Sequence, residues 1–351
     1  MTKFNSAFSR RKVLLGMTSA LAAPMLIRPR SAFASTNSLT FVTWGGAYRD
    51  AITEGTIKPF TEETGIEVNI VDTPDLAKVK AQVMTNNVEW DIFDAPGAMG
   101  ASGEKEGYWE PLDSSIFDIG DMTVAPTEHL MPFYTWAGGI AWDGDRFGEG
   151  EHPRNFTEYF DFEAFPGLRT FRNRPSETLE AALLADGVPP SEVYPIDVDR
   201  AFAALERIKP QVASWVAATP QTISLLRTGE VDYSYTYASR VKTNSKDGGN
   251  LKFSFDQTLN GLEYLAVVKN APNKENAMKF LAFSLRPEIQ AATMELLGNA
   301  PISKAAVPLI SDESRKWLPD LTSPDQLILN DQWWAEELET VSRRFKEWVL
   351  A

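Results

Sequence analysis

Between residues 38 and 93, apolar and polar positions repeat at the spacings of alternating strands and helices. Residues 66–70 alternate at period two, as a half-buried strand does, and the stretch before them has helical spacing that ends at Gly65. The pattern predicts strands at 39–43, 66–70 and 90–93 and helices at 47–63 and 76–84. This alternation is typical of a sheet that helices cover on both faces, which is an α/β fold.

A second block with its own pattern begins near Ala137. Residues 136–142 have small residues at the centre and tryptophan at both ends, which suits a strand that crosses between two lobes. The spacing beyond predicts helices at 176–186, 200–208 and 333–348, strands at 233–237 and 264–268, a helix capped by Asn273, and a helix from Pro287 to Gly298. The sequence has no low-complexity linker, so we expect short strands to connect the lobes.

The turn after the first predicted strand is a candidate for ligand contact. Residues 44–48 are Trp-Gly-Gly-Ala-Tyr and follow the carboxyl end of that strand, where ligands bind in sheets of this kind. The glycines let the backbone approach a ligand, and Trp44 and Tyr48 can flank it. Packing of Trp44 in the core is the alternative interpretation.

The first 34 residues have the order of a cleaved export signal. Residues 9–12 are Ser-Arg-Arg-Lys, an apolar run follows at 13–27, and Ala32-Phe33-Ala34 supplies small residues for cleavage after Ala34. The paired arginines indicate the twin-arginine route. The apolar run is short for a bilayer span, although an N-terminal membrane anchor is the alternative. We therefore expect a periplasmic protein.

Composition and charge narrow the class of function. The chain has no cysteine, which excludes disulfides, thiol catalysis and a lipid-modified N-terminal cysteine. The leader carries six basic residues and no acidic one, so its removal changes the formal net charge from −14 to −20. Such a charge disfavours nucleic acid and anionic lipid as partners, and it raises the local concentration of small cations. Solubility alone is the other explanation.

Two rival functions have weaker support in the residues. An exported enzyme is one, but the chain has only two histidines, His129 and His152, and lacks the common metalloprotease, hydrolase and dinucleotide motifs. A receptor for iron or calcium is the other, because Tyr233, Tyr235 and Tyr237 could bind a hard metal. Their alternation along one predicted strand is explained more simply by the preference of tyrosine for strands. We expect no resident cofactor.

Several segments together resemble a known family. The chain is similar to the periplasmic solute-binding proteins of ABC importers, in the group that takes up spermidine, putrescine and related amino compounds. The matching segments are 43–48, 59–68, Trp90-Asp91, 110–113, 165–167, 179–188, 229–231 and 270–274. The resemblance runs from about residue 38 to the end, and it depends on the order and spacing of these pieces.

This resemblance implies a two-lobed periplasmic-binding-protein fold of type II-like form, in which each lobe is a sheet flanked by helices and the ligand cleft lies between the lobes. The expected division is a signal peptide at 1–34, a first lobe from 35–137 plus 264–298, and a second lobe from 138–263 plus 299–351 with the C-terminal helix. The implied partners are a small amine-bearing ligand and an inner-membrane ABC permease. We expect a monomer that is neither an enzyme nor embedded in a membrane.

The resemblance also implies particular site residues. It places Trp44 and Tyr48 in the cleft and Tyr237 at the position of an aromatic ring beneath the ligand. Glu263 and Glu177 match carboxylates that bind ligand ammonium groups. An ammonium group that leaves water gains from a charged partner and from an aromatic face, which agrees with this set. A surface position for Glu263 and a helix-dipole role for Glu177 are the alternatives.

The sequence departs from the polyamine-binding pattern at several positions. Arg174 replaces an acid, and Gly97, Ala98 and Asn299 stand at positions where aromatic residues are usual. An arginine would repel a second ammonium group and could pair with a carboxylate, as Arg172 and Arg240 also could. This favours a ligand with an amine at one end and a carboxylate at the other, such as γ-aminobutyrate. A diamine such as putrescine is the alternative.

Overall fold

The computed structural model describes residues 37–246 and 249–351, so the predicted signal peptide at 1–34 lies outside the described residues. The strands are β1 (Ser38–Thr43), β2 (Glu67–Asp72), β3 (Ile92–Pro96), β4 (Leu130–Asp143), β5 (Arg169–Arg172), β6 (Val212–Val216), β7 (Tyr233–Tyr237), β8 (Leu251–Phe253), β9 (Leu259–Val267), β10 (Ala300–Pro301) and β11 (Leu327–Ile328). The helices are α1 (Ala47–Ile52), α2 (Lys58–Thr64), α3 (Leu76–Thr85), α4 (Gly97–Lys105), α5 (Phe156–Phe160), α6 (Thr178–Ala185), α7 (Val198–Ile208), α8 (Thr219–Arg227), α9 (Ala238–Lys246), α10 (Lys274–Ser284), α11 (Pro287–Leu297), α12 (Asp312–Arg315) and α13 (Asp331–Leu350).

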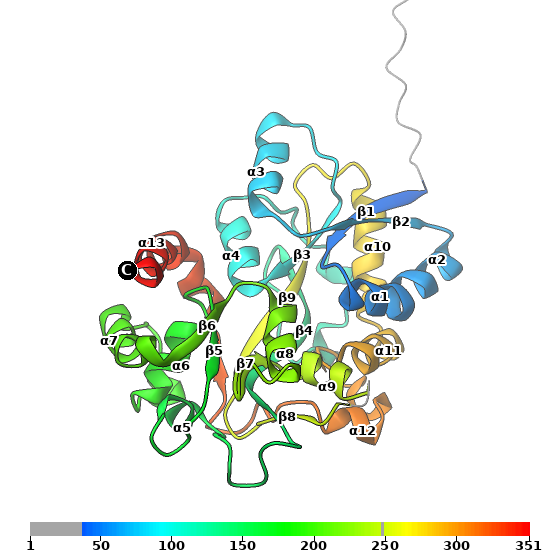
Figure 1. Ribbon diagram of the computed structural model, residues 1–351. Coiled ribbons are helices and arrows are strands. Elements are labelled where there is room, and N and C mark those ends of the chain that lie inside the picture. Colours follow the sequence, from blue (N-terminus) through cyan, green and yellow to red (C-terminus); the bar gives the residue numbers. More distant parts are fainter. Residues whose placement is uncertain (1–36, 247–248) are drawn as a thin grey trace, which may run out of the picture. The chain divides into compact units, whose positions relative to one another are not determined.

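One long strand connects the two ends of the sheet. The strand order is β2-β1-β3-β9-β4-β7-β5-β6. β4 pairs antiparallel with β9 along Leu130–Gly138 and with β7 along Gly138–Trp142. The outer strands pair in parallel, β1 with β2 and β3, and β5 with β6 and β7. Figure 1 shows β9 and β4 running between the two groups of helices. The segment predicted at 136–142 is therefore the second half of this crossing strand.

Among the described residues, buried apolar side chains form three clusters, and the two largest lie at opposite ends of the crossing strands. The first cluster takes residues from 39–134 and 262–310. The second takes residues from 140–259 and 327–345, including Trp334 and Phe345 of α13. Ile302, Ala306 and Ile310 join the first cluster, whereas the sequence prediction assigned 299–351 to the second lobe. The division into two lobes with the stated boundaries stays a prediction.

The helix predicted at 47–63 is present, but it contains a wider turn. Residues Thr53–Ile57 form a π-helical turn between α1 and α2. Helix α11, more than two hundred residues later, packs against this turn; Figure 1 shows it beside α1. Gly55 permits the close approach, because a Cβ there would lie 2.6 Å from the Thr293 hydroxyl.

Asn273 precedes α10 as predicted, but its side chain does not cap the helix. The side-chain amide donates to Asp91 Oδ2 at 3.0 Å, and the Asn273 backbone N–H donates to Asp91 Oδ1 at 2.7 Å. The backbone N–H of Thr40 also donates to Asp91, at 2.7 Å. Asp91 is fully buried, so its carboxylate needs hydrogen-bond donors, and the side chain of Asn273 turns toward it instead of accepting from the first turn of the helix. The contact fixes α10 to β1 and β3.

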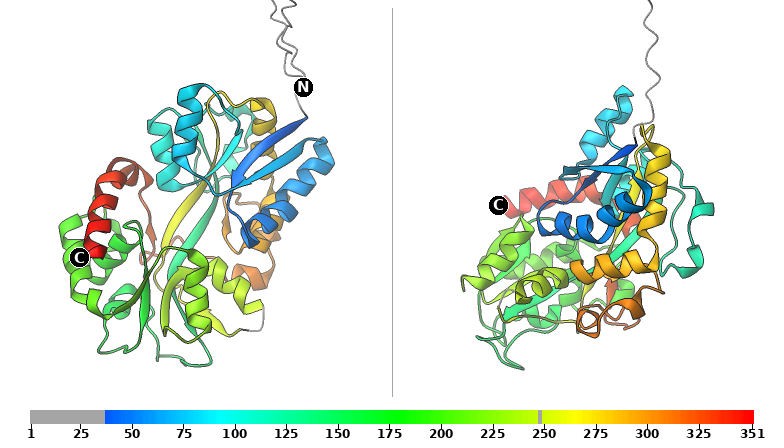
Figure 2. Two further views of the ribbon diagram at one scale, coloured as in Figure 1. Left: turned by 45° about the horizontal axis from the view of Figure 1, so that its top comes forward. Right: turned by 90° about the vertical axis from the view of Figure 1, so that its right-hand side faces the viewer.

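The C-terminal helix α13 packs on both sides of the crossing strands. Its first turn lies against α4, where Gly97 leaves room for the Asp331 carboxylate. Its body joins the second core cluster, and the Trp334 indole donates to Glu180 Oε1 at 2.6 Å. The Tyr194 hydroxyl donates to the same oxygen at 2.5 Å. Figure 2 shows α13 alongside the helices of the second cluster. Within 37–246 and 249–351, no helix combines the length and apolar character needed to cross a bilayer.

The Glu180 contact predicts a pH-dependent contribution to stability. Burial raises the pKa of Glu180 to about 7 from its ordinary 4.5. The folded protein therefore holds this proton where the unfolded chain has lost it, so the contribution is complete below about pH 4.5 and is lost as the pH rises through about 7. For Glu180→Gln, we expect the difference in unfolding free energy between pH 5 and pH 8 to be about 2 to 3 kcal/mol smaller than in the wild type. Urea unfolding at both pH values measures it, and an identical difference in the two proteins would contradict it.

Candidate ligand-binding site

The crossing strands present a row of side chains on one face of the sheet. Tyr134, Trp136 and Gly138 alternate along β4 and therefore share this face. Trp136 packs edge-on against Tyr237 of β7, with ring centroids 5.4 Å apart. Gly261 on β9 lies opposite Trp136, and a Cβ there would come within 2.1 Å of the indole. The small residues of the crossing segment thus make room for aromatic side chains that line the site.

A pair of buried carboxyl groups lies at the first-cluster end of this face. Glu263 on β9 is only 4% exposed, and it accepts a hydrogen bond from the Trp44 indole at 2.8 Å. Asp94 on the neighbouring strand β3 is fully buried, and it lies close enough to Glu263 for each carboxyl group to shift the pKa of the other. The hydroxyls of Thr43 and Tyr48 donate to Asp94 Oδ2 at 2.6 and 2.9 Å. The predicted residues Trp44, Tyr48 and Glu263 are therefore brought together, around an aspartate that the prediction did not include.

Burial shifts both carboxyl groups toward the neutral form. It raises the pKa of Glu263 well above its ordinary value, and the adjacent Asp94 raises it further. Burial also raises the pKa of Asp94, to about 6, although hydrogen bonds from Thr43, Glu263 and Tyr48 oppose the shift. Tyr48 is itself buried and holds Asp94, so its hydroxyl supports the pair from behind.

A charged cluster lies at the other end of the face, beside Tyr237. Glu177 is buried and accepts hydrogen bonds from the hydroxyls of Tyr235 and Tyr237, both at 2.8 Å. Arg174 pairs with the same carboxylate and also donates to the Tyr237 hydroxyl at 2.6 Å. The Glu177 carboxylate thus already holds a cation from its own chain. This geometry favours a positioning role for Glu177 over direct contact with a ligand amine.

Glu177 also has an unusual backbone conformation. It directly precedes α6 with φ 72° and ψ −38°, outside the regions that residues with a side chain ordinarily occupy. Such a conformation costs about 1–3 kcal/mol and persists where surrounding contacts hold it. Its three hydrogen-bond donors supply that restraint here. Strain of this kind gathers at binding sites more often than elsewhere.

Two further arginines face the same region. Arg172 is 4% exposed, and its Nη2 donates to the Ala217 carbonyl at 3.2 Å. Its Nε and Nη1 atoms are buried without a hydrogen-bond partner among the described residues, and burial lowers its pKa. Arg240 on α9 is near enough to Tyr134 to act on its hydroxyl electrostatically, and no hydrogen bond from its guanidinium is made within the described part of the chain. Arginine nitrogens without partners suit an anionic ligand group.

The remaining candidate residues lie in other environments. Ala98 packs against the second core cluster, and Asn299 is buried next to β10. His152 stacks on Trp142 at 3.5 Å, and Nδ1 of His129 lies 3.1 Å from Glu104. Across 37–246 and 249–351, no group of three or more histidine, aspartate or glutamate side chains is arranged to hold a metal ion.

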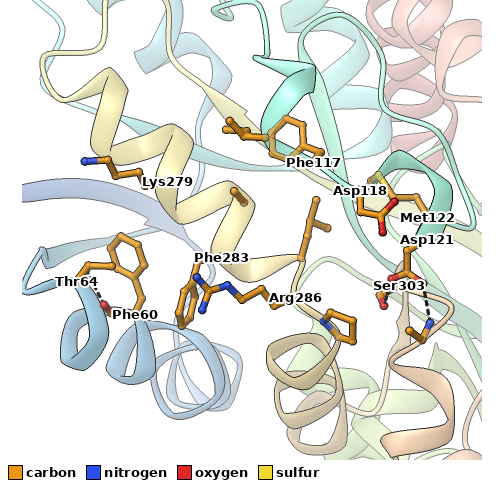
Figure 3. A pocket seen from close by; sticks show the side chains of 15 residues that line it. Phe60, Thr64, Phe117, Asp118, Asp121, Met122, Lys279, Phe283, Arg286 and Ser303 are labelled. Atoms are coloured by element: carbon orange, nitrogen blue, oxygen red, sulfur yellow. Dashed lines mark hydrogen bonds between the residues drawn. The ribbon is translucent and has the colours of Figure 1, made fainter.

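A separate pocket of about 590 Å³ lies in the first-cluster part of the molecule, away from the carboxyl pair. Figure 3 shows Phe60, Phe117 and Phe283 around it, with Arg286 at one side. Arg286 already pairs with Glu63 at 2.8 Å. Asp118, Asp121 and Lys279 also line this pocket, but neither the buried carboxyl pair nor Arg172, Arg174 or Arg240 does.

Comparison with known proteins identifies the family. Residues 55–318 match the model of the bacterial extracellular solute-binding proteins. The chain belongs to this family. Among curated relatives, a γ-aminobutyric acid-binding protein of Pseudomonas aeruginosa is 32% identical over 99% of this chain and 98% of its own length. The putrescine-binding periplasmic protein SpuD of the same species is 25% identical over 76% of this chain and 80% of its own.

A solved structure of a related receptor has the same fold as this chain. The structure of the Atu4243–γ-aminobutyrate receptor has a TM-score of 0.83 and 30% identity, covering 89% of this chain and 97% of that one. The predicted α/β, periplasmic-binding-protein fold is confirmed, and so is the resemblance to the solute-binding family.

The conformation of Glu177 gives a test of how the charged cluster is held. Glu177→Ala removes the acceptor of the Tyr235 hydroxyl and the partner of Arg174, so we expect it to lower the unfolding free energy by about 2–4 kcal/mol. Glu177→Gly removes the same carboxylate but relieves the positive φ, and it should be about 1 kcal/mol more stable than the alanine variant. Urea unfolding compares the two. At a position with ordinary φ the order reverses, so a more stable alanine variant would argue against strain.

Proposed function

We propose that this protein is the substrate-binding component of an ABC importer and that it captures a small solute with an ammonium group at one end and a carboxylate at the other. A γ-amino acid such as γ-aminobutyrate has this form. The observation that carries the proposal is the placement of a buried carboxyl pair and a set of arginines on one face of the crossing strands. The name of the 32%-identical relative, a γ-aminobutyric acid-binding protein, supports the same ligand class.

The ammonium end of the ligand lies against Asp94 and Glu263 in this proposal. Neither carboxyl group forms an ion pair with a lysine, arginine or histidine among the described residues, so the pair has an unmatched preference for a cation. Trp44 holds Glu263 through its indole N–H and leaves its ring partly exposed. An ammonium group there gains charge-assisted hydrogen bonds and contact with an aromatic face.

The carboxylate end lies against Arg172, with Arg174 and Arg240 close by. The unpartnered Nε and Nη1 of Arg172 would donate to the ligand oxygens. The same positive charge disfavours a diamine, because two like charges about 4 Å apart repel by roughly 4 kcal/mol at an effective dielectric constant of ~20. That repulsion corresponds to about a thousandfold loss of affinity for a second ammonium group. Other relatives are named as putrescine- and spermidine-binding proteins, so a diamine is the alternative ligand.

In this proposal, transport depends on a shift between the open and closed conformations of the protein and involves no chemical reaction of the ligand. We place the two lobes around the first and second core clusters, with β4 and β9 crossing between them. A ligand that contacts both ends of the site favours the closed arrangement by its difference in affinity for the two states. An inner-membrane permease would then receive the closed, monomeric protein in the periplasm, after export and removal of the leader. No bond of the ligand is broken, so the protein is not an enzyme in this proposal.

Titration calorimetry with γ-aminobutyrate and putrescine separates the two ligand classes. We expect the wild type to bind γ-aminobutyrate more tightly. We expect Arg172→Gln to weaken γ-aminobutyrate by about 10- to 100-fold, because hydrogen bonds to charged groups contribute about 1.5–3 kcal/mol. Putrescine has a second ammonium group in place of the carboxylate, so the same substitution removes a repulsive charge and should improve its binding.

Arg286→Gln is the matched control, because Arg286 is an arginine with a surface partner far from the site. It should leave both affinities unchanged. Tight binding of putrescine by the wild type, with no binding of γ-aminobutyrate, would refute the amino-acid ligand and support a polyamine importer.

A further inference from the structure

We propose that Asp94, which lies behind the ligand-facing Glu263, carries the negative charge of the amine site at neutral pH, while Glu263 keeps its proton and donates it to Asp94. This inference rests on the proposed function. In this inference, Asp94 determines the affinity for a cation. Glu263 is neutral and serves the ligand as a hydrogen-bond acceptor. The argument comes from the hydrogen-bond donors around each group.

The hydrogen-bond donors around Asp94 favour the ionised form of its carboxyl group. Its Oδ2 accepts from the hydroxyls of Thr43 and Tyr48. Its Oδ1 is buried and receives no hydrogen bond from an N–H or hydroxyl group of the described residues. A proton on Glu263 would fill that remaining position, since β3 and β9 pair side by side and bring the two carboxyl groups close together. Asp94 would then have three donors, which stabilise a buried carboxylate, whereas Glu263 has only the Trp44 indole.

The surrounding charged groups do not reverse this assignment. Tyr48 on α1 and Tyr134 on β4 are buried, and burial raises the pKa of both hydroxyls well above 10, so both remain neutral. Arg174 is paired with Glu177 and acts on Glu263 only at a distance. Arg240 on α9 acts on Tyr134. No cation contacts either carboxyl group directly within the described residues, so the pair as a unit carries one negative charge.

A single charge shared in this way has a chemical consequence. One ammonium group neutralises the pair, and a proton competes with it for Asp94. The pKa of Asp94, about 6 without ligand, sets where this competition begins. As the pH falls below about 6, the pair becomes neutral and the affinity for an ammonium group should fall about tenfold per pH unit. Above about 7, Asp94 is already ionised and the affinity should be constant.

Isosteric substitutions distinguish the roles of the two carboxyl groups. With γ-aminobutyrate at pH 7, we expect Asp94→Asn to weaken binding about 100-fold, because the charge is removed and burial, the largest cause of the raised pKa of Glu263, still keeps the proton on that residue. Glu263→Gln imitates a protonated glutamate and should weaken binding by less than about fivefold, and it should keep the decline below pH 6. Asp94→Asn should lose that decline. Calorimetric titrations from pH 5 to pH 8 provide these values, with thermal unfolding to verify that each variant is folded.

The opposite order, with Glu263→Gln the more damaging substitution, would overturn the inference and leave the proposed function standing. Failure of the wild type to bind either γ-aminobutyrate or putrescine would instead overturn the proposed function. The location of the proton is measured separately, by ¹³C NMR of labelled carboxyl groups in the ligand-free wild type. Titration of Asp94 near pH 6 with Glu263 protonated throughout supports the inference, and an ionised Glu263 beside a protonated Asp94 at pH 7 refutes it. This measurement needs no variant, so it decides the question even where Asp94→Asn does not fold.

Discussion

The pairing of β4 with β9 along its first part and with β7 along its second part holds the candidate site together. A ladder of backbone hydrogen bonds fixes the register of all three strands, and register decides which side chains share a face. Tyr134 and Glu263 are placed opposite each other, and Tyr237 is opposite Gly138 four residues further along β4. At the usual rise of a strand, this separation is on the order of 13 Å. A solute of a few carbon atoms, as proposed above, matches this spacing between the two ends.

Electrostatics then divides that face into two ends of opposite character. Acidic groups gather where β3 and β9 meet, and arginines gather around Tyr237. The two ends differ in whether the protein itself supplies a counterion. Arg174 is paired with the carboxylate of Glu177. Glu263, in contrast, accepts its hydrogen bond from the indole of Trp44, which carries no charge. A zwitterionic solute complements this arrangement because it supplies one charge of each sign, and buried charges are stable only when they are matched.

Local patterns in the sequence predicted most of the fold, since strand and helix periodicities depend on neighbouring residues. The strand at 233–237 and the helices starting near 274 and 287 are found where the pattern placed them. The π-helical turn at Thr53–Ile57 was not predictable in this way, because it depends on the approach of α11. The same limit applies to the side-chain amide of Asn273, which is held by Asp91 rather than by its own helix.

The candidate site was predicted less completely, for a similar reason. Trp44 was predicted from the turn after the first strand, whereas Glu263 and Tyr237 came only from a family resemblance; the structure places all three at the face described. Asp94 was missed because its contact with Glu263 depends on the pairing of β3 with β9. A signal did exist, since Asp94 is an acid inside an otherwise apolar strand. The left-handed backbone of Glu177 has no comparable signal, because nothing in its neighbours requires a positive φ.

Helix α13 has a mechanical consequence for the protein. Its first turn lies against α4, which also contacts β3 and β9, and Trp334, three residues further along, is hydrogen-bonded to Glu180 of α6. The helix therefore ties α4 to α6, so any movement of one relative to the other must carry α13 along or break one of these contacts. The twenty residues of this helix thus restrain two elements that lie far from them in the sequence.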